Sequence, residues 1–168
     1  ILYRGGKYVQ GVTRGDGVRG DDVTSNVKTI RSLPLHITDS RDIEVRGEVY
    51  LPFESFQRIN AEQEKSGKPL FANPRNAASG SIRLLDPREV ASRKLDSFLY
   101  YIFVQGNELP TQWEGLKKLK DLGFKANLQS RLCSNLEEVI AFWEEWRDKR
   151  DRLDYDVDGI VIKVNSTE

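Results

Sequence analysis

The sequence contains no methionine and, among its 168 residues, only one cysteine and one histidine. The single cysteine, Cys133, excludes an internal disulfide and a thiolate-rich zinc site. Its position between Leu132 and Ser134 fits a small packing residue better than a nucleophile. Because His36 has no second histidine to work with, the sequence also excludes a histidine pair that binds a metal or relays a proton.

Long apolar runs are absent as well, and no segment has the form of a signal peptide. Lys and Arg together number 26, and so do Asp and Glu. Net charge therefore provides no bulk attraction to nucleic acid or to a membrane, and any anion site requires local clustering of cations. We expect a cytoplasmic protein without a membrane partner. Since the chain opens on Ile1 rather than on methionine, we also expect an internal fragment of a longer protein.

Two strand-like segments carry charges that a buried strand normally excludes. In residues 44–50, alternation places Val45 and Val49 on one face and Glu48 on the other. Residues 158–164 are apolar on both faces through Ile160, Val161 and Ile162, which predicts a central strand covered on both sides. Lys163 ends that apolar run, and a buried ammonium requires an anion or an acceptor. A structural ion pair with a carboxylate and a functional contact both satisfy this requirement.

The remaining pattern predicts strands and helices without regular alternation. A hairpin is expected at Gly5-Gly6, and a loop rich in Gly and Asp at 15–22. Helices are expected from residue 53 to about 67, within 73–86, from a capping box at 111–114 and from a second one at 134–137. An aromatic strand is expected over 97–104. The tryptophans at 143 and 146 are expected in the core. This order predicts an α+β fold, with a mostly antiparallel sheet and flanking helices.

Residues 71–83 combine small side chains with two arginines. The small residues at 77–81 allow another backbone or a phosphate to approach closely. Arg75 and Arg83 lie on one face about 12 Å apart if the helix is continuous. Two guanidinium groups at that spacing suit neighbouring phosphates, and a helix N-terminus near Asn76 adds partial positive charge. A pair of surface arginines on a tightly packed helix is the alternative interpretation.

Together these segments resemble the nucleotidyltransferase (adenylation) domain of the bacterial NAD-dependent DNA ligases. The similarity runs in order over essentially the whole chain, and the ordered set is far more specific than any one motif. It rests on TRGDG at 13–17, GDDVTSN at 20–26, EVRGEV at 44–49, NPRNAASGSIR at 73–83 and DVDGIVIKVN at 156–165. The resemblance implies an ATP-grasp-like nucleotidyltransferase core. It also implies that residues 1–168 are a partial domain, incomplete at both ends.

The resemblance implies a reaction in three steps. A lysine attacks the adenylyl phosphorus of NAD and releases nicotinamide mononucleotide, AMP passes to the 5′-phosphate of a DNA nick, and the 3′-hydroxyl then displaces AMP. By analogy, the adenylate pocket contains Arg14, Glu48, Lys163 and Tyr100. In this pocket Glu48 accepts a hydrogen bond from a ribose hydroxyl, Lys163 meets the adenine edge or the phosphate, and Tyr100 stacks on adenine. For Tyr100, an aromatic residue of a core strand is the alternative. The analogy further implies catalytic roles for three residues, with Arg75 and Arg83 holding phosphates and Asp158 binding magnesium.

Asp158 and Lys163 stand about 16 Å apart if both lie on one strand, which excludes a simple ion pair between them. The family's nucleophile lies in a Lys-x-Asp-Gly motif that this chain lacks. Arg14 has a similar spacing to Asp16 and Gly17, but a guanidinium stays protonated and cannot attack. We therefore expect the nucleophilic lysine upstream, a last lysine motif downstream, and no self-adenylylation by this chain alone.

The implied cofactors are NAD and Mg²⁺, with Mn²⁺ as a possible substitute, and zinc is expected only in the parent protein. The implied partner is nicked double-stranded DNA in the bacterial cytoplasm at the nucleoid, and no obligate protein partner is implied. Two alternatives stay open. An ATP- or GTP-dependent nucleotidyltransferase, either a ligase or a capping enzyme, would share the pocket, although NPRNAASG favours the NAD branch. A non-catalytic nucleic-acid-binding module would use only the arginines, but Glu48 and Asp158 would repel a phosphate backbone.

Overall fold

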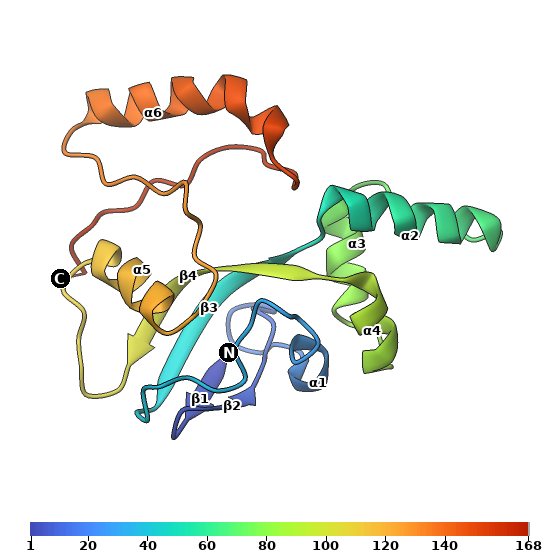
Figure 1. Ribbon diagram of the computed structural model, residues 1–168, viewed down its shortest axis with the longest axis horizontal. Helices are drawn as coiled ribbons and strands as arrows, with labels where there is room; N and C mark the ends of the chain where they lie inside the picture. Colours follow the sequence, from blue (N-terminus) through green and yellow to red (C-terminus); the bar gives the residue numbers. More distant parts are fainter. Residues whose placement is uncertain (168) are drawn as a thin grey trace.

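The computed structural model describes residues 1–167, which form an α+β domain built on a four-stranded antiparallel sheet (Figure 1). The strand order is β2-β1-β3-β4. The predicted antiparallel sheet with flanking helices is therefore confirmed. The strands are β1 (Leu2–Arg4), β2 (Lys7–Gln10), β3 (Ile43–Tyr50) and β4 (Asp96–Val104). The helices are α1 (Thr24–Val27), α2 (Phe53–Lys65), α3 (Pro74–Ser81), α4 (Pro87–Arg93), α5 (Gln112–Asp121) and α6 (Leu136–Lys149), followed by the 3₁₀ turn η1 (Arg150–Arg152).

The predicted hairpin joins β1 to β2. Arg4 lies opposite Lys7, and the two-residue loop between them consists of Gly5 and Gly6. Both glycines have positive φ, 56° and 74°, as a tight two-residue turn requires. The local sequence thus determines this hairpin.

The strands β3 and β4 form the central pair of the sheet. They are paired from Ile43 opposite Val104 to Tyr50 opposite Asp96, with a bulge between Arg46 and Gly47. Alternation along β3 buries apolar side chains on one face and leaves charged ones exposed on the other. The predicted strand over residues 44–50 is confirmed, including its two unlike faces.

A helical lobe of α2, α3 and α4 gathers at one end of β3 and β4 (Figure 1). Helix α3 begins at Pro74, and the side chain of Asn73 caps it by accepting a hydrogen bond from the N–H of Asn76 at 2.8 Å. Ala77 and Ala78 are buried, so α3 packs closely against β3. The small residues of this segment serve packing on the buried side and leave the first turn of the helix accessible.

Helix α5 packs against β4 and closes the core. Thr111 caps it by accepting from the N–H of Glu114 at 3.1 Å, as the sequence predicts. Leu119 is fully buried among the largest core side chains, with Tyr3, Val45 and Leu99 from the sheet. Within residues 1–167, no helix is both long and apolar enough to cross a bilayer.

Helix α6 differs from its prediction in two ways. Its cap is Asn135, which accepts from the N–H of Glu138 at 2.9 Å, so the capping box lies one residue later than expected. The helix has no buried residue, and Trp143 is 50% exposed. The prediction that its tryptophans lie in the core is wrong, because α6 lies at the edge of the molecule beside extended chain rather than on the sheet (Figure 1).

Residues 158–164 do not form the predicted central strand. They run extended without ladder pairing, and Val161 and Val164 are each 83% exposed. The outer edge of β4 is partly engaged elsewhere, since the N–H of Leu99 bonds to the carbonyl of Lys125 at 2.8 Å. The C-terminal segment is instead attached to the start of α5, where the N–H of Gln112 donates to the carbonyl of Asn165 at 2.7 Å.

Candidate active site

Most of the candidate residues face a single large cavity. It has a volume of about 1210 Å³ and lies between β3, β4, the start of α3, the start of α5, α6 and the C-terminal segment. Glu48, Arg75, Tyr100, Asp158 and Lys163 all line it. These residues come from four separate parts of the chain, so only the folded structure brings them together.

The sheet places Glu48 and Tyr100 at the cavity. Glu48 is exposed and lies opposite Phe98 in the register of β3 and β4. Gly47 precedes it at the bulge, where a Cβ atom would collide with the backbone carbonyl of Phe98. The Arg-Gly-Glu sequence of β3 therefore combines a close strand contact with a carboxylate that is free to face the cavity.

Lys163 and Tyr100 are in direct contact. The ammonium nitrogen of Lys163 lies 4.5 Å from the centre of the Tyr100 ring, which is the geometry of a cation–π interaction. Partial burial lowers the pKa of Lys163 from its usual value, because desolvation disfavours the charged form. Residues 158–164 form no strand, so the rise along a strand does not set the separation of Lys163 from Asp158. Nevertheless, within residues 1–167 no ion pair joins Lys163 to Asp158.

Arg75 lies in the first turn of α3, with its side chain exposed at the cavity. The first-turn N–H groups of a helix and the helix dipole favour an anion at this end. The N–H of Asn76 is already bonded to the Asn73 side chain. Arg75 therefore provides the main cation at the α3 end of the cavity.

Arg83 and Arg14 do not line this cavity. Arg75 and Arg83 do not share one continuous helix, because α3 ends at Ser81, so the condition for placing both on one helix face is not met. Arg83 instead donates to the carboxylate of Asp21 at 2.9 Å and to the hydroxyl of Ser79 at 2.6 Å. It ties the helical lobe to the loop that follows β2.

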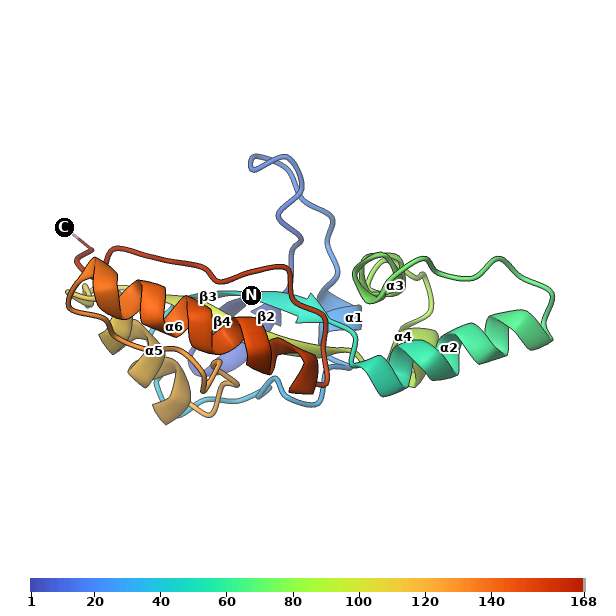
Figure 2. The same ribbon diagram turned by 90° about the horizontal axis from the view of Figure 1, so that it is seen from above.

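That loop carries Arg14 and projects from the body of the domain (Figure 2). Asp16 shapes its tip, because its carboxylate accepts from the N–H groups of Val18 at 2.8 Å and Arg19 at 2.7 Å. These hydrogen bonds lower the pKa of Asp16. Arg14 is exposed at the base of this tip, so it is available to a ligand that reaches beyond the cavity.

An aromatic cluster that the sequence analysis missed forms one wall of the cavity. The rings of Tyr50 and Phe98 stack with centres 5.0 Å apart and planes within 6°, and Tyr155 packs at 5.1 Å and 5.2 Å from them. Lys125 lies beside this cluster and pairs with Asp96. Tyr50 and Phe98 were visible as strand residues, but nothing in the sequence indicated that Tyr155 and Lys125 join them.

Three further arginines line the cavity from the other side. Arg131 precedes α6, Arg147 lies within it and Arg150 follows it. The run of six charged residues at 147–152, four of them cations, is the sequence signal for this part of the lining. The cavity therefore combines aromatic surface, three carboxylates (Glu48, Asp156 and Asp158) and several cations, which is a lining suited to a nucleotide with its phosphates.

The donor set limits how a metal can bind. In the described part of the chain, no group of three or more His, Cys, Asp or Glu residues could hold a metal ion. Asp158 and Glu48 line the same cavity, and Asp158 has no hydrogen bond or ion pair within residues 1–167. Magnesium is commonly held by one or two carboxylates together with substrate phosphates and water. The residues present fit that mode and do not fit a zinc site made by protein side chains alone.

Comparison with known proteins gives concordant results. A family model described as "NAD-dependent DNA ligase adenylation domain" matches residues 1–168. A DNA ligase of Thermotoga neapolitana is 56% identical over 166 residues, which cover 98% of this chain and 24% of that protein. DNA ligases of Fervidobacterium nodosum and Bacillus cereus are 53% and 51% identical, covering 100% and 98% of this chain and 25% of each relative. The chain thus spans about a quarter of the length of these relatives.

Proposed function

This chain belongs to the family of NAD-dependent DNA ligase adenylation domains, and we propose that it holds the adenylyl half of NAD for transfer to DNA. The observation that carries the proposal is the convergence of Glu48, Arg75, Tyr100 and Lys163 on one cavity. In this proposal the α+β domain is part of an ATP-grasp-like nucleotidyltransferase core. The whole protein seals nicked double-stranded DNA in replication and repair.

The adenosine half is assigned to the contact between Lys163 and Tyr100. Adenine stacks on the Tyr100 ring, which is 42% exposed and already attracts a cation to its face. Lys163 then contacts the adenine edge or the phosphate, since an ammonium displaced from the ring needs a new acceptor. Glu48 accepts a hydrogen bond from a ribose hydroxyl.

The phosphates are assigned to the arginines. Arg75 faces the cavity, Arg14 lies on the projecting loop, and Arg83 pairs with Asp21 of that loop. The three arginines therefore line a route for phosphates from the pocket to the DNA. In the first step a lysine amine forms a P–N bond to the adenylyl phosphorus, and the P–O bond to nicotinamide mononucleotide breaks. Guanidinium groups stabilise the charge that develops on the phosphoryl oxygens. The nucleophilic lysine lies outside these 168 residues in this proposal.

The proposed metal is Mg²⁺, with Mn²⁺ as a substitute. Asp158 would hold it, because its carboxylate faces the cavity and has no partner within residues 1–167. Such an ion supplies Lewis-acid stabilisation of phosphate charge when bound. Zinc is assigned to the parent protein outside this chain.

The test uses the full-length ligase that contains this domain. Glu48→Ala and Lys163→Ala should each abolish formation of the enzyme–AMP adduct from NAD, because the adenylate loses its ribose acceptor or its cation. The adduct is measured by gel shift and by mass, with circular dichroism as a check on folding. Matched controls are Glu44→Ala, an acidic residue of β3 outside the cavity, and Lys120→Ala on α5. Wild-type adduct levels in either cavity variant would refute the assignment.

A further inference from the structure

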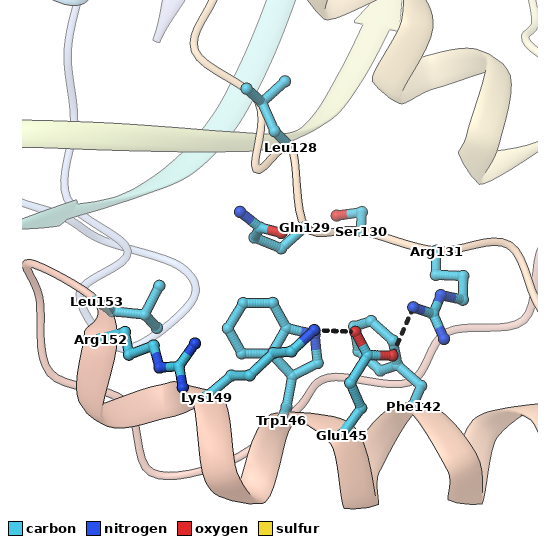
Figure 3. A pocket seen from close by; sticks show the side chains of 10 residues that line it. All are labelled: Leu128, Gln129, Ser130, Arg131, Phe142, Glu145, Trp146, Lys149, Arg152 and Leu153. Atoms are coloured by element: carbon cyan, nitrogen blue, oxygen red, sulfur yellow. Dashed lines mark hydrogen bonds and ion pairs between the residues drawn. The ribbon is translucent and has the colours of Figure 1, made fainter.

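A second, smaller pocket lies beside the large cavity. It has a volume of about 420 Å³ and is formed by residues 128–131 on one side and by α6 and η1 on the other (Figure 3). Phe142 and Trp146 of α6 form its apolar floor, with ring centres 6.1 Å apart. Both rings also line the large cavity, so the two spaces are neighbours.

Positive charge dominates the lining of this pocket. Arg131, Lys149 and Arg152 line it, and Glu145 is the only acidic residue among its lining residues. Glu145 bonds to two of the cations, accepting from Arg131 at 2.7 Å and from Lys149 at 2.6 Å (Figure 3). Three cations against one carboxylate leave an excess of positive charge in a concave site.

The arrangement holds two cations in place and leaves a third available. The guanidinium of Arg131 lies 4.8 Å from the centre of the Phe142 ring, so a cation–π contact and the Glu145 ion pair both fix it. The side chain of Arg152 has no hydrogen bond or ion pair within residues 1–167, whereas the ammonium of Lys149 is directed to Glu145 (Figure 3). A guanidinium without a carboxylate partner can form charge-assisted hydrogen bonds with a bound anion.

We propose that this pocket binds a phosphate group, with Arg152 as its principal ligand and Arg131 and Lys149 as supporting cations. The planar fork of Arg152 matches two phosphate oxygens, and the excess positive charge suits an anion of charge greater than one. Glu145 acts as a positioning residue that keeps Arg131 and Lys149 on either side of the pocket. The assignment of this phosphate to a DNA strand rests on the proposed function. The prediction that the pocket binds a phosphate group rests only on the charges and geometry of its lining.

The test uses the 168-residue chain labelled with ¹⁵N. The indole N–H signal of Trp146, assigned by loss in Trp146→Phe, reports on the floor of the pocket during titration. The probes are inorganic phosphate, a 5′-phosphorylated thymidine dinucleotide, and acetate at equal ionic strength. Phosphate should shift the Trp146 signal in a saturable way, and acetate should not. Arg152→Gln should weaken phosphate binding about tenfold, because a charge-assisted hydrogen bond is lost.

The matched control is Arg31→Gln, which removes an exposed arginine outside the pocket and should leave binding unchanged. Arg152→Lys keeps the charge but loses the fork and should give a smaller loss, so the inference remains testable if Arg152→Gln does not fold. Equal weakening by Arg31→Gln, an equal effect of acetate, or an unchanged Trp146 signal would overturn the phosphate site. Tighter binding of the dinucleotide than of inorganic phosphate supports the assignment of the bound phosphate to a DNA strand. Equal binding of the two probes overturns that assignment but leaves the phosphate site itself standing. Because no arm uses NAD, failure here is distinct from failure of the proposed adenylylation.

Discussion

Replacing Lys125 with methionine should destabilise the domain by about 2 kcal/mol. The ammonium of Lys125 pairs with the carboxylate of Asp96, donates to the hydroxyl of Tyr50 at 2.8 Å, and lies 4.7 Å from the centre of the Phe98 ring. A charge-assisted hydrogen bond contributes about 1.5–3 kcal/mol and a cation–π contact about 0.5–1 kcal/mol. The side chains of Lys125 and Asp96 are 38% and 24% exposed, so solvent screening reduces the sum.

Urea unfolding followed by circular dichroism measures this loss, and a thermal scan should show a fall of about 4–8 °C. Methionine retains most of the apolar volume, so the change removes charge and hydrogen bonds rather than packing. Lys120→Met is the control, because Lys120 is exposed near the C-terminal end of α5 and its replacement should cost less than about 0.5 kcal/mol. If Lys125→Met costs no more than Lys120→Met, the pairing with Asp96 does not stabilise the fold and the reasoning fails.

The same interaction predicts a dependence on pH. Burial favours the neutral form of Asp96, but hydrogen bonds from Lys125, the N–H of Ser97 and Tyr50 outweigh it and hold the pKa of Asp96 below its usual value. A depressed carboxyl pKa contributes stability that is complete above the unfolded value of about 4 and is lost as pH falls through the folded pKa. Wild-type stability should therefore fall below about pH 4 more steeply than that of Lys125→Met.

Two other outcomes are expected. Gly47→Ala should destabilise the domain by about 1–3 kcal/mol in urea unfolding, because the new methyl group meets the carbonyl of Phe98 at the bulge. The control Gly67→Ala places its methyl group in open space and should cost less despite the positive φ of Gly67. A larger loss for Gly67→Ala than for Gly47→Ala would contradict the register of β3 and β4. The chain incubated with NAD and Mg²⁺ should gain no AMP mass, and an AMP adduct mapped to Lys7 or to Lys163 would show that the nucleophile lies within these residues.

Local sequence predicted several elements accurately. Two consecutive glycines suffice for the hairpin after Arg4, because they adopt positive φ without steric cost. Asn73 and Pro74 fix the start of α3 through a side-chain cap and a preset φ. The alternation around Val45 fixes which face of β3 is buried. In each case the physical determinant lies within a few residues of the element it specifies.

The failed predictions share one physical cause. Apolar residues at 160–164 and along α6 show which side chains would gain from burial, but burial requires a partner surface supplied by another part of the chain. Within residues 1–167, α6 has no buried residue and residues 158–164 pair with no strand. The periodicity of apolar residues could not reveal that residues 1–167 provide no surface that buries α6 or pairs with residues 158–164.

For the candidate site too, some features were determined by the sequence and others only by the tertiary structure. The sequence alone determined the residue types and their order, from Glu48 in an Arg-Gly-Glu strand to Lys163 after an apolar run, and these already indicated the family. Only the tertiary structure decided that Glu48, Arg75 and Lys163 face one cavity while Arg83 pairs with Asp21 outside it. The reason is that residue identity is local, whereas convergence depends on the register of β3 and β4 and on where the chain returns at Asn165.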